Sequence, residues 1–420
     1  MTSLPARAWR FLVQPRGRPV HPFHRLAHRA RGSRSGVALV VVIASIVVMT
    51  TVVSEMAFQV RVRFLLSGHQ LQQAQAYWLA CTGVNIYRLI LTGNYQLKQS
   101  SVMQTVGQAT GVNMGDALWQ AVPFLSSGLM RMVFVSGGSA DELDEQDAQE
   151  LRTRGTVSEE IAEASREKSR FSDEGFLDFE GDFSAQIVDE ERKINVNAFA
   201  RRGTATALQE NVTAQALYGL MSGIENDQWF YDRNIDRWEI IANLADWVDA
   251  DTTRCGLEGG YEDDLYNRLE DPYLSKNASF DTKDEIRLVA GWEGEVFDRY
   301  EDRLTVWGSG KINVNTADRE VLVGLLRAYA STSDDLANTM VDLLDQYAMV
   351  TSFQSTKDFT SYLEAQGIQV SDELKNVITT SSSVFTVTSM GVVGTTTVTL
   401  TAVLDYSSSP LGITKYWRVD

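Results

Sequence analysis

Residues 35–56 read SGVALVVVIASIVVMTTVVSEM, and this stretch decides how the remainder of the chain can be interpreted. From Val37 to Val53, only serine and threonine side chains interrupt a continuous apolar run. As a helix with a rise of 1.5 Å per residue, the run would span roughly 26 Å, close to the hydrocarbon thickness of a bilayer. The stretch therefore predicts one membrane-spanning helix at about residues 37–53.

The residues on either side of the apolar run predict its orientation. Residues 1–36 contain eight arginines and neither aspartate nor glutamate, and such a basic flank keeps the N-terminus in the cytoplasm. A secretory signal peptide would have an apolar region of about 7–15 residues followed by a cleavage site of small residues. The run ends instead in Ser54-Glu55-Met56. We therefore expect a membrane anchor that places the C-terminal body on the far side of the membrane.

Helical spacing continues beyond the apolar run. Residues with three- or four-residue spacing are Phe58, Val62, Leu65, His69, Tyr77, Cys81 and Val84. The stretch lacks proline and is rich in helix-forming residues, which favours a continuous helix. The pattern predicts one helix from about Val37 to about Leu91. A membrane anchor followed by a separate core helix is the alternative.

The charged and histidine residues argue against two functional classes. The formal net charge is −17 although residues 1–36 are purely basic, so the body is strongly acidic and would be repelled by phosphate backbones. Three of the four histidines lie in residues 1–36, which leaves His69 alone in the body. A histidine-dependent triad or a multi-histidine metal site therefore cannot form there. We predict that the chain is not an enzyme and does not bind nucleic acid.

The two cysteines, Cys81 and Cys255, do not make a disulfide framework in a chain of 420 residues. The sequence favours two unpaired thiols and leaves open a single pair in an oxidising compartment.

The N-terminal pattern resembles a known family. A basic segment ends at Gly36, an apolar helix follows, and residues 72–91 read QQAQAYWLACTGVNIYRLIL. Together these features resemble the type IV pilin-like superfamily and, within it, the general secretion pathway protein K (GspK) family, the large minor pseudopilins of type II secretion. The resemblance implies a single-pass protein of the bacterial inner membrane with a periplasmic body. Its implied work is to help initiate and to cap the pseudopilus for protein export across the outer membrane. The implied partners are the I- and J-type minor pseudopilins, the major pseudopilin and the prepilin peptidase.

The same resemblance implies that the prepilin peptidase cleaves between Gly36 and Val37. Ser35 stands where the family usually has lysine or arginine, and Gly32 offers a second cleavage position. Cleavage after Gly32 would leave Arg34 at the head of the membrane helix, so we favour Gly36.

The fifth residue of the mature chain would be Val41, counted from Val37. Most pilins carry glutamate at this position, where it pairs with a neighbouring subunit, and K-type pseudopilins characteristically lack it. A carboxylate in lipid is costly unless it is paired, and a subunit with nothing above it has no partner for one. Val41 therefore marks the chain for the tip of the filament.

Beyond the helix, the patterns predict an α+β fold: a long N-terminal transmembrane helix, a pilin-like antiparallel sheet and a large, mostly α-helical insertion. SGLMRMVFVSGG at residues 127–138, the residues from Gly181 onward and the Val/Thr-rich C-terminus have the alternation of strands. Residues 139–182 are acidic and predict a solvated loop or frayed helix. The expected organisation is a leader at 1–36, a helix at 37–95, the first part of the pilin-like domain at 96–192, the helical insertion at 193–376 and C-terminal strands at 377–420.

The pentapeptide KINVN occurs twice, at residues 193–197 and 311–315. Each copy predicts a short strand followed by a helix, with Asn197 or Asn315–Thr316 as the helix cap. Helical spacing recurs in Trp238–Ala250 and in Asp334–Val350. These patterns indicate two related helical lobes that arose by internal duplication.

The KINVN phrase also resembles helix-hairpin-helix DNA-binding domains. These need a glycine hairpin whose backbone amides meet phosphate, and here Gly367 stands alone in acidic surroundings. A membrane-anchored helix-hairpin-helix DNA-binding protein is therefore the alternative function.

Residues 246–271 read DWVDADTTRCGLEGGYEDDLYNRLED, an acidic segment with several glycines. Calcium takes six to eight oxygen ligands in flexible geometry, which closely spaced carboxylates can supply. On composition alone, a solvated loop and a metal site are equally good interpretations. The resemblance to K-type pseudopilins implies calcium, with ligands drawn from the acidic residues Asp249, Asp251, Glu262, Asp263 and Asp264.

Overall fold

The computed structural model describes residues 35–100, 116–135, 179–201, 208–255, 260–330 and 332–420. The predicted leader, apart from Ser35 and Gly36, and most of the acidic segment 139–182 lie outside the described residues. Residues up to Ser67 and residues from Gly68 onward form two compact units, which are described separately below.

The longest element is α1 (Ser35–Gln99), an uninterrupted α-helix of 65 residues, so the prediction of one continuous helix is confirmed. Within the described residues, it is the one helix long and apolar enough to cross a membrane. The three hydroxyl groups of its apolar run are paired internally: those of Ser45 and Thr51 donate hydrogen bonds to the carbonyl oxygens of Val41 and Val48, each at 2.8 Å, and that of Thr50 donates to Ile46. This pairing satisfies polar groups where no water is available.

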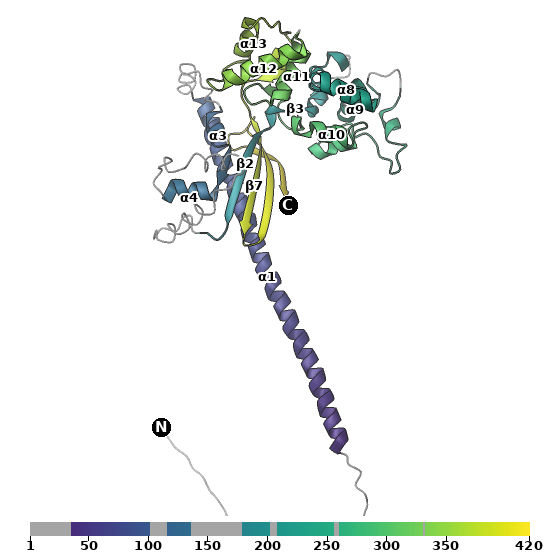
Figure 1. The fold of residues 1–420 in the computed structure, drawn as a ribbon, viewed down its shortest axis with the longest axis vertical. Coiled ribbons are helices and arrows are strands. Elements are labelled where there is room, and N and C mark those ends of the chain that lie inside the picture. Colours follow the sequence, from purple (N-terminus) through teal and green to yellow (C-terminus); the bar gives the residue numbers. More distant parts are fainter. Residues whose placement is uncertain (1–34, 101–115, 136–178, 202–207, 256–259, 331) are drawn as a thin grey trace, which may run out of the picture. The chain divides into compact units, whose positions relative to one another are not determined.

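The body contains a five-stranded antiparallel sheet in the order β1-β2-β7-β8-β9 (Figure 1). Strands β2 and β7 are far apart in the sequence, yet they pair along their length, from Asp182 opposite Val392 to Asp189 opposite Phe385. A helical block is therefore inserted between two neighbouring strands, and the predicted α+β class is confirmed. The strands are β1 (Phe124–Ser126), β2 (Asp182–Asp189), β7 (Val384–Val393), β8 (Thr396–Asp405) and β9 (Ile413–Val419).

The strand predicted at residues 127–138 is wrong. Residues Ser127–Val135 form helix α4, which follows strand β1 and the short helix α3 (Ala117–Ala121). The hydroxyl of Ser126 accepts a hydrogen bond from the backbone N–H of Leu129 and so supports the start of α4. From α4, the guanidinium of Arg131 pairs with Asp182 of β2 at 2.7 Å. These contacts override the β-like alternation of the apolar residues.

Small residues let α1 lie close against the sheet. Ala76 and Ala80 of α1 are fully buried. A Cβ atom at Gly391 of β7 would lie 2.0 Å from the carbonyl oxygen of Ala76. A Cβ atom at Gly83, also in α1, would lie 2.3 Å from the hydroxyl oxygen of Ser389 in β7. The packing of α1 on the sheet therefore requires glycine at both contact points.

The helical block has two lobes, which we define as lobe 1 (residues 193–306) and lobe 2 (residues 311–380); several of their helices are labelled in Figure 1. Lobe 1 contains β3 (Ile194–Asn195), α7 (Val212–Leu220), α8 (Ile224–Arg233), α9 (Arg237–Val248), α10 (Glu295–Tyr300) and β4 (Leu304–Thr305). Lobe 2 contains β5 (Ile312–Asn313), α11 (Arg319–Tyr329), α12 (Asp334–Ala348), α13 (Thr356–Ala365), α14 (Leu374–Val377) and β6 (Ile378–Thr379). Short 3-10 helices are η2 (Glu190–Arg192), η3 (Val196–Arg201), η4 (Leu208–Glu210), η5 (Glu262–Leu265), η6 (Lys283–Leu288) and η7 (Glu301–Arg303).

The two KINVN copies make the same contacts in the two lobes. In lobe 1, β3 pairs in parallel with β4, and the amide of Asn197 donates to the carbonyl oxygens of Phe280 and Val306. In lobe 2, β5 pairs in parallel with β6. There, the amide of Asn315 donates to the carbonyl oxygens of Phe353 and Thr380.

In both lobes, the side-chain oxygen of the asparagine also accepts a hydrogen bond from the backbone N–H of the phenylalanine. The predicted helix-cap role of Asn197 and Asn315 is therefore wrong. Each asparagine lies two residues beyond its short strand and instead holds two distant backbone segments there. The cap position of α11 is occupied by Asp318, whose side chain makes no capping hydrogen bond and instead pairs with Arg192.

Three consecutive buried carboxylates join the sheet to the lobes, at the point where β2 ends. Asp189 accepts a hydrogen bond from the Thr316 hydroxyl of lobe 2 at 2.6 Å. Glu190 accepts hydrogen bonds from the hydroxyls of Thr305 in lobe 1 and Thr386 in β7. The third carboxylate, Glu191, accepts from the backbone N–H groups of Ser309 and Ser383, on either side of lobe 2.

We predict that Gly391→Ala lowers the free energy of unfolding by about 1–3 kcal/mol, because the added methyl group collides with the backbone of α1. Gly68→Ala is the matched control, since a Cβ atom there meets nothing within 4 Å and helical Gly→Ala gains about 0.5–1 kcal/mol. Denaturant unfolding of the detergent-solubilised chain measures both. Equal stability of the two variants would show that the close contact between α1 and β7 is not required.

Candidate functional site

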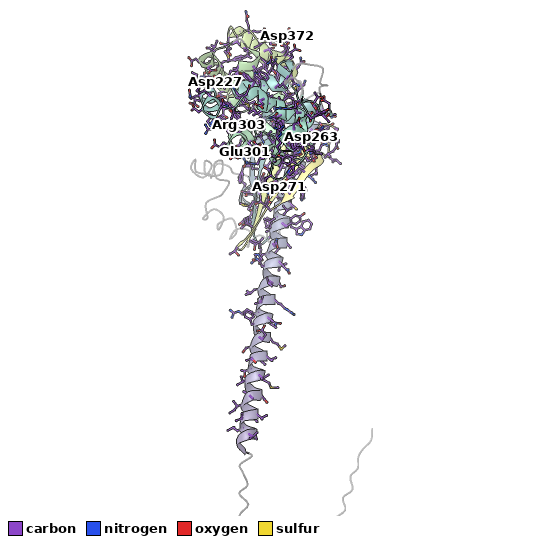
Figure 2. The ribbon with its side chains drawn as sticks, turned by 90° about the vertical axis from the view of Figure 1, so that its right-hand side faces the viewer. Asp227, Asp263, Asp271, Glu301, Arg303 and Asp372 are labelled. Carbon is purple, nitrogen blue, oxygen red and sulfur yellow. The ribbon has the colours of Figure 1, made fainter. Side chains whose placement is uncertain are left out.

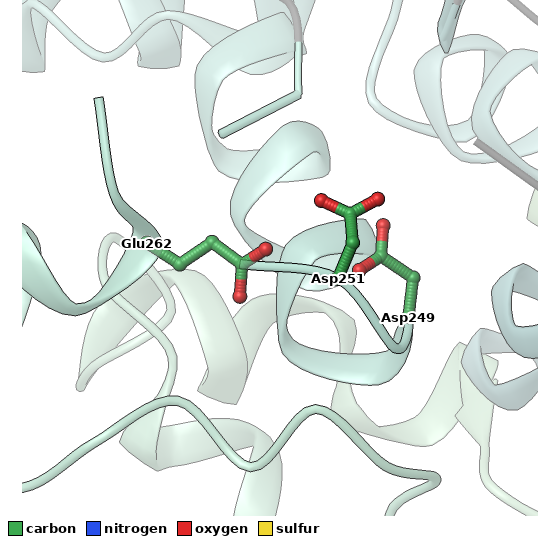
Figure 3. Close-up of side chains that lie close together, drawn as sticks. All are labelled: Asp249, Asp251 and Glu262. Atoms are coloured by element: carbon green, nitrogen blue, oxygen red, sulfur yellow. The ribbon is translucent and has the colours of Figure 1, made fainter. Parts of the chain in front are cut away.

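Three carboxylates converge in lobe 1. One carboxylate oxygen each from Asp249, Asp251 and Glu262 lies within 4.8 Å of the other two. Figure 3 shows the Glu262 side chain reaching toward the two aspartates from a separate stretch of chain. Within the part of the chain that the structure describes, it is the one group of three or more His, Cys, Asp or Glu residues with this geometry.

A short antiparallel pairing creates the convergence. Asp249 caps the C-terminus of α9, and Glu262 is the first residue of η5. The backbone N–H of Glu262 donates to the carbonyl oxygen of Thr252 at 3.3 Å, and Thr253 forms an antiparallel bridge with Tyr261. The chain therefore turns back on itself directly after α9 and returns Glu262 to the aspartates.

Glu262, the most buried residue of the cluster, lacks hydrogen bonds to its carboxylate in the described part of the chain. Glu262 is 1% exposed, and neither of its carboxylate oxygens has a hydrogen-bond partner among the described residues. Burial, followed by the negative charge of Asp246, raises the pKa of Glu262 to about 8. Burial and the negative charge of Asp251 raise the pKa of Asp249 to about 6. An added positive charge would therefore stabilise the ionised cluster strongly.

The donor atoms fit a hard cation. All three side chains offer oxygen, and an oxygen of Asp249 is also buried without a hydrogen-bond partner. The side-chain oxygen of Asn277 is buried and unpartnered as well, while its amide donates to the carbonyl oxygen of Asp251 at 2.7 Å. Calcium and magnesium prefer carboxylate, amide and carbonyl oxygens of this kind.

The structure does not bring all five predicted ligands together. Asp263 accepts hydrogen bonds from the backbone N–H and the hydroxyl of Ser275, at 2.9 and 3.0 Å. Asp264 accepts a hydrogen bond from the backbone N–H of Tyr261 at 3.3 Å and so caps η5. Both carboxylates shape the loop and lie outside the three-residue cluster. Exposed acids, among them Asp227, Asp271 and Asp372, are labelled in Figure 2.

The predicted ligands did not include Asp246, whose negative charge acts on Glu262 of the cluster. It is 3% exposed and accepts a hydrogen bond from the backbone N–H of Cys255 at 2.8 Å. Burial raises the pKa of Asp246 to about 7; the bond from Cys255 opposes the shift, and the charge of Asp249 adds to it. The signal was present, because Asp246 precedes Asp249 by three residues, which places both on one helical face.

The residues predicted at the N-terminal site all lie at the start of α1. Gly36 is in the first turn, and the side chains of Val37 and Val41 are 68% and 58% exposed. The predicted leader ahead of Ser35 lies outside the described residues. Cys81, which is buried, and Cys255 are both free thiols.

Comparison with known proteins finds a family model that matches lobe 1. Residues 192–309 match the family model described as Type II secretion system (T2SS), protein K. The type II secretion system protein K of Klebsiella pneumoniae is 28% identical over 151 residues, which are 35% of this chain and 44% of that protein. The protein of the same name from Pseudomonas aeruginosa is 28% identical over 191 residues, 46% of this chain and 52% of that protein. The chain thus spans about half the length of the curated relatives that it matches.

Among solved structures, the crystal structure of the GspK-GspI-GspJ complex from the enterotoxigenic Escherichia coli type 2 secretion system is similar. The TM-score is 0.46 and the sequence identity 18%, over 57% of this chain and 80% of that chain.

Proposed function

We propose that this chain, which belongs to the protein K family of type II secretion systems, is a minor pseudopilin that helps initiate and then caps the pseudopilus. The observation that carries the proposal is the family match over residues 192–309, because this stretch contains the whole of lobe 1 and the Asp249–Asp251–Glu262 cluster. Helix α1 supports the proposal with one apolar anchor of sufficient length. The work of the protein in this proposal is assembly rather than catalysis.

The proposed topology follows from charge and burial. The arginine-rich residues 1–36 keep the N-terminus in the cytoplasm, so the body, with its acidic excess, lies in the periplasm. The proposed partners are the I- and J-type minor pseudopilins and the major pseudopilin, with the inner membrane holding α1. The prepilin peptidase would process the leader.

We predict cleavage between Gly36 and Val37. N-terminal sequencing of the chain extracted from membranes should therefore begin Val-Ala-Leu-Val. A Gly36→Leu variant should retain the leader and run as the longer species, because the cleavage position would no longer hold the small residue that the peptidase recognises. A mature start at Met1, or near Glu55, would exclude a prepilin.

We predict that the chain co-purifies with its I- and J-type counterparts and occupies one end of the assembled pseudopilus. Electron microscopy of epitope-labelled filaments measures the position. Val41→Glu should reduce assembly, because a tip subunit offers no neighbour to pair with the buried carboxylate, whereas Val41→Leu should not. Labels spaced along the shaft would contradict a tip role.

Tight duplex DNA binding by the chain that weakens steeply with salt would favour the helix-hairpin-helix alternative.

We further propose that the three-carboxylate cluster binds calcium. The support is the buried, unpartnered Glu262 carboxylate, which faces two further carboxylates from a second segment. A cation there would neutralise mutual repulsion among groups that the protein has already removed from water. Asp249, Asp251 and Glu262 would hold the ion, with Asp246 beside them.

We predict that a chelator lowers the melting temperature of the chain. A ligand bound only by the folded state contributes about 2.7 kcal/mol at a hundredfold excess over its dissociation constant. The double variant Asp249→Asn/Asp251→Asn should abolish this calcium effect. Asp264→Asn should preserve it, since the structure places Asp264 outside the cluster. Identical melting curves in calcium and in chelator would reduce the cluster to a solvated acidic loop.

A further inference from the structure

The two lobes can be compared position by position beyond their strands. Trp247, the penultimate residue of α9, stacks on Phe280 with ring centroids 6.3 Å apart and an interplanar angle of 10°. In lobe 2, Tyr347, the penultimate residue of α12, stacks on Phe353 at 4.5 Å and 15°. Phe280 and Phe353 are also the residues held by the two KINVN asparagines. Each lobe therefore joins a helix end to the same aromatic position.

The connection between these positions differs between the lobes. In lobe 1, it comprises residues 248–279, whereas in lobe 2 it comprises only residues 348–352. Lobe 2 thus closes an equivalent core with one short turn. The extra residues of lobe 1, which we call the inserted segment (residues 249–278), are an addition to one copy of a duplicated fold.

All three carboxylates of the cluster belong to the inserted segment. The ion pairs of Arg254 and Lys276, two of the segment's basic residues, are made elsewhere: with Glu239 at 3.8 Å, and with Asp281 and Glu285, each at 2.8 Å. Among the described residues, none of the ion pairs involves Asp249, Asp251 or Glu262. Glu262, buried and without a hydrogen-bond partner, is the group that most requires a cation.

We propose that calcium at the cluster acts as a local clasp: it orders the inserted segment, and its loss releases this segment while the duplicated core of both lobes stays folded. The inference rests on the calcium site proposed above and adds that the effect of the metal is confined to the inserted segment. It makes the cluster a conformational device on the surface of lobe 1 instead of a requirement for the lobe to fold.

Several contacts that hold the core lie outside the inserted segment. Helices α7 and α11 cross closely: a Cβ atom at Gly219 would lie 2.1 Å from the carbonyl oxygen of Gly324, and a Cβ atom at Gly324 would lie 2.7 Å from the backbone nitrogen of Leu220. The asparagine bonds of both KINVN copies are equally independent of the segment. Its apolar links to the core are Tyr266, which is 2% exposed and packs edge-on against Trp247 at 5.4 Å, Tyr273, which packs edge-on against Trp247 at 6.2 Å, and Leu265.

Hydrogen–deuterium exchange of the full-length, detergent-solubilised chain tests the proposal in calcium and in chelator. Amides in residues 250–255 and 260–277 should exchange at least tenfold faster in chelator, whereas those in α7, α9, α11 and α12 should not change. The Asp249→Asn/Asp251→Asn variant should show the faster pattern in both conditions. Faster exchange throughout α7 and α9 on calcium removal would overturn the local clasp and leave the calcium site standing.

A replacement variant tests the inserted segment independently of calcium. Residues 249–278 are exchanged for the lobe 2 connection, Met349–Thr351. The variant should unfold cooperatively, at a lower temperature because it loses Tyr266, and its melting curve should not respond to calcium. Loss of cooperative unfolding, together with core-wide exchange in chelator, would show that the segment is integral to lobe 1. A chain that shows no calcium dependence in any segment would overturn the calcium site and the clasp together.

Discussion

The body of this protein depends on the three consecutive carboxylates Asp189, Glu190 and Glu191. Strands β2 and β7 are neighbours in the sheet, so the chain must leave for the helical block and return beside its point of departure. The three acids lie at that point and are each 3% exposed or less. Buried carboxylates are tolerated only when donors satisfy them, and these donors come from the sheet and from both lobes. These hydrogen bonds fix the lobes on the sheet, because any other placement would leave the buried carboxylates without donors.

The remainder of the body follows from close packing on either side of this junction. On the sheet side of the junction, Gly391 and Gly83 allow α1 to lie closer to β7 than larger residues would permit. On the lobe side, Gly219 and Gly324 allow a similarly close contact between α7 and α11. Close backbone contact thus holds the sheet to residues 76–83 of α1 and the lobes to each other, whereas hydrogen-bonded carboxylates join the sheet to the lobes.

The likeness of the two lobes bears on why the carboxylate cluster occurs in one of them. Both lobes use an asparagine two residues beyond a two-residue strand to hold a phenylalanine and the residue that follows the returning strand. That arrangement is complete in lobe 2 without any acidic segment. The carboxylates of the cluster are therefore not needed to close a core, and the Glu262 carboxylate is buried without a hydrogen-bond partner among the described residues, which is the observation behind the calcium proposal.

The sequence by itself determined the elements whose pattern lies within their own residues: α1, α9, α12 and the strands β2, β7 and β8. It also identified the acidic stretch 246–271 as a candidate cation site. Only the tertiary structure decided that residues 127–135 are helical, because Arg131 finds Asp182 across the fold. Only the tertiary structure selected Asp249, Asp251 and Glu262 from five candidate acids, since backbone pairing of Thr252 with Glu262 sets their distance while Ser275 and Tyr261 occupy Asp263 and Asp264. Spacing along a chain reports which face a side chain takes, but the distance between two segments is set by contacts that a local pattern does not contain.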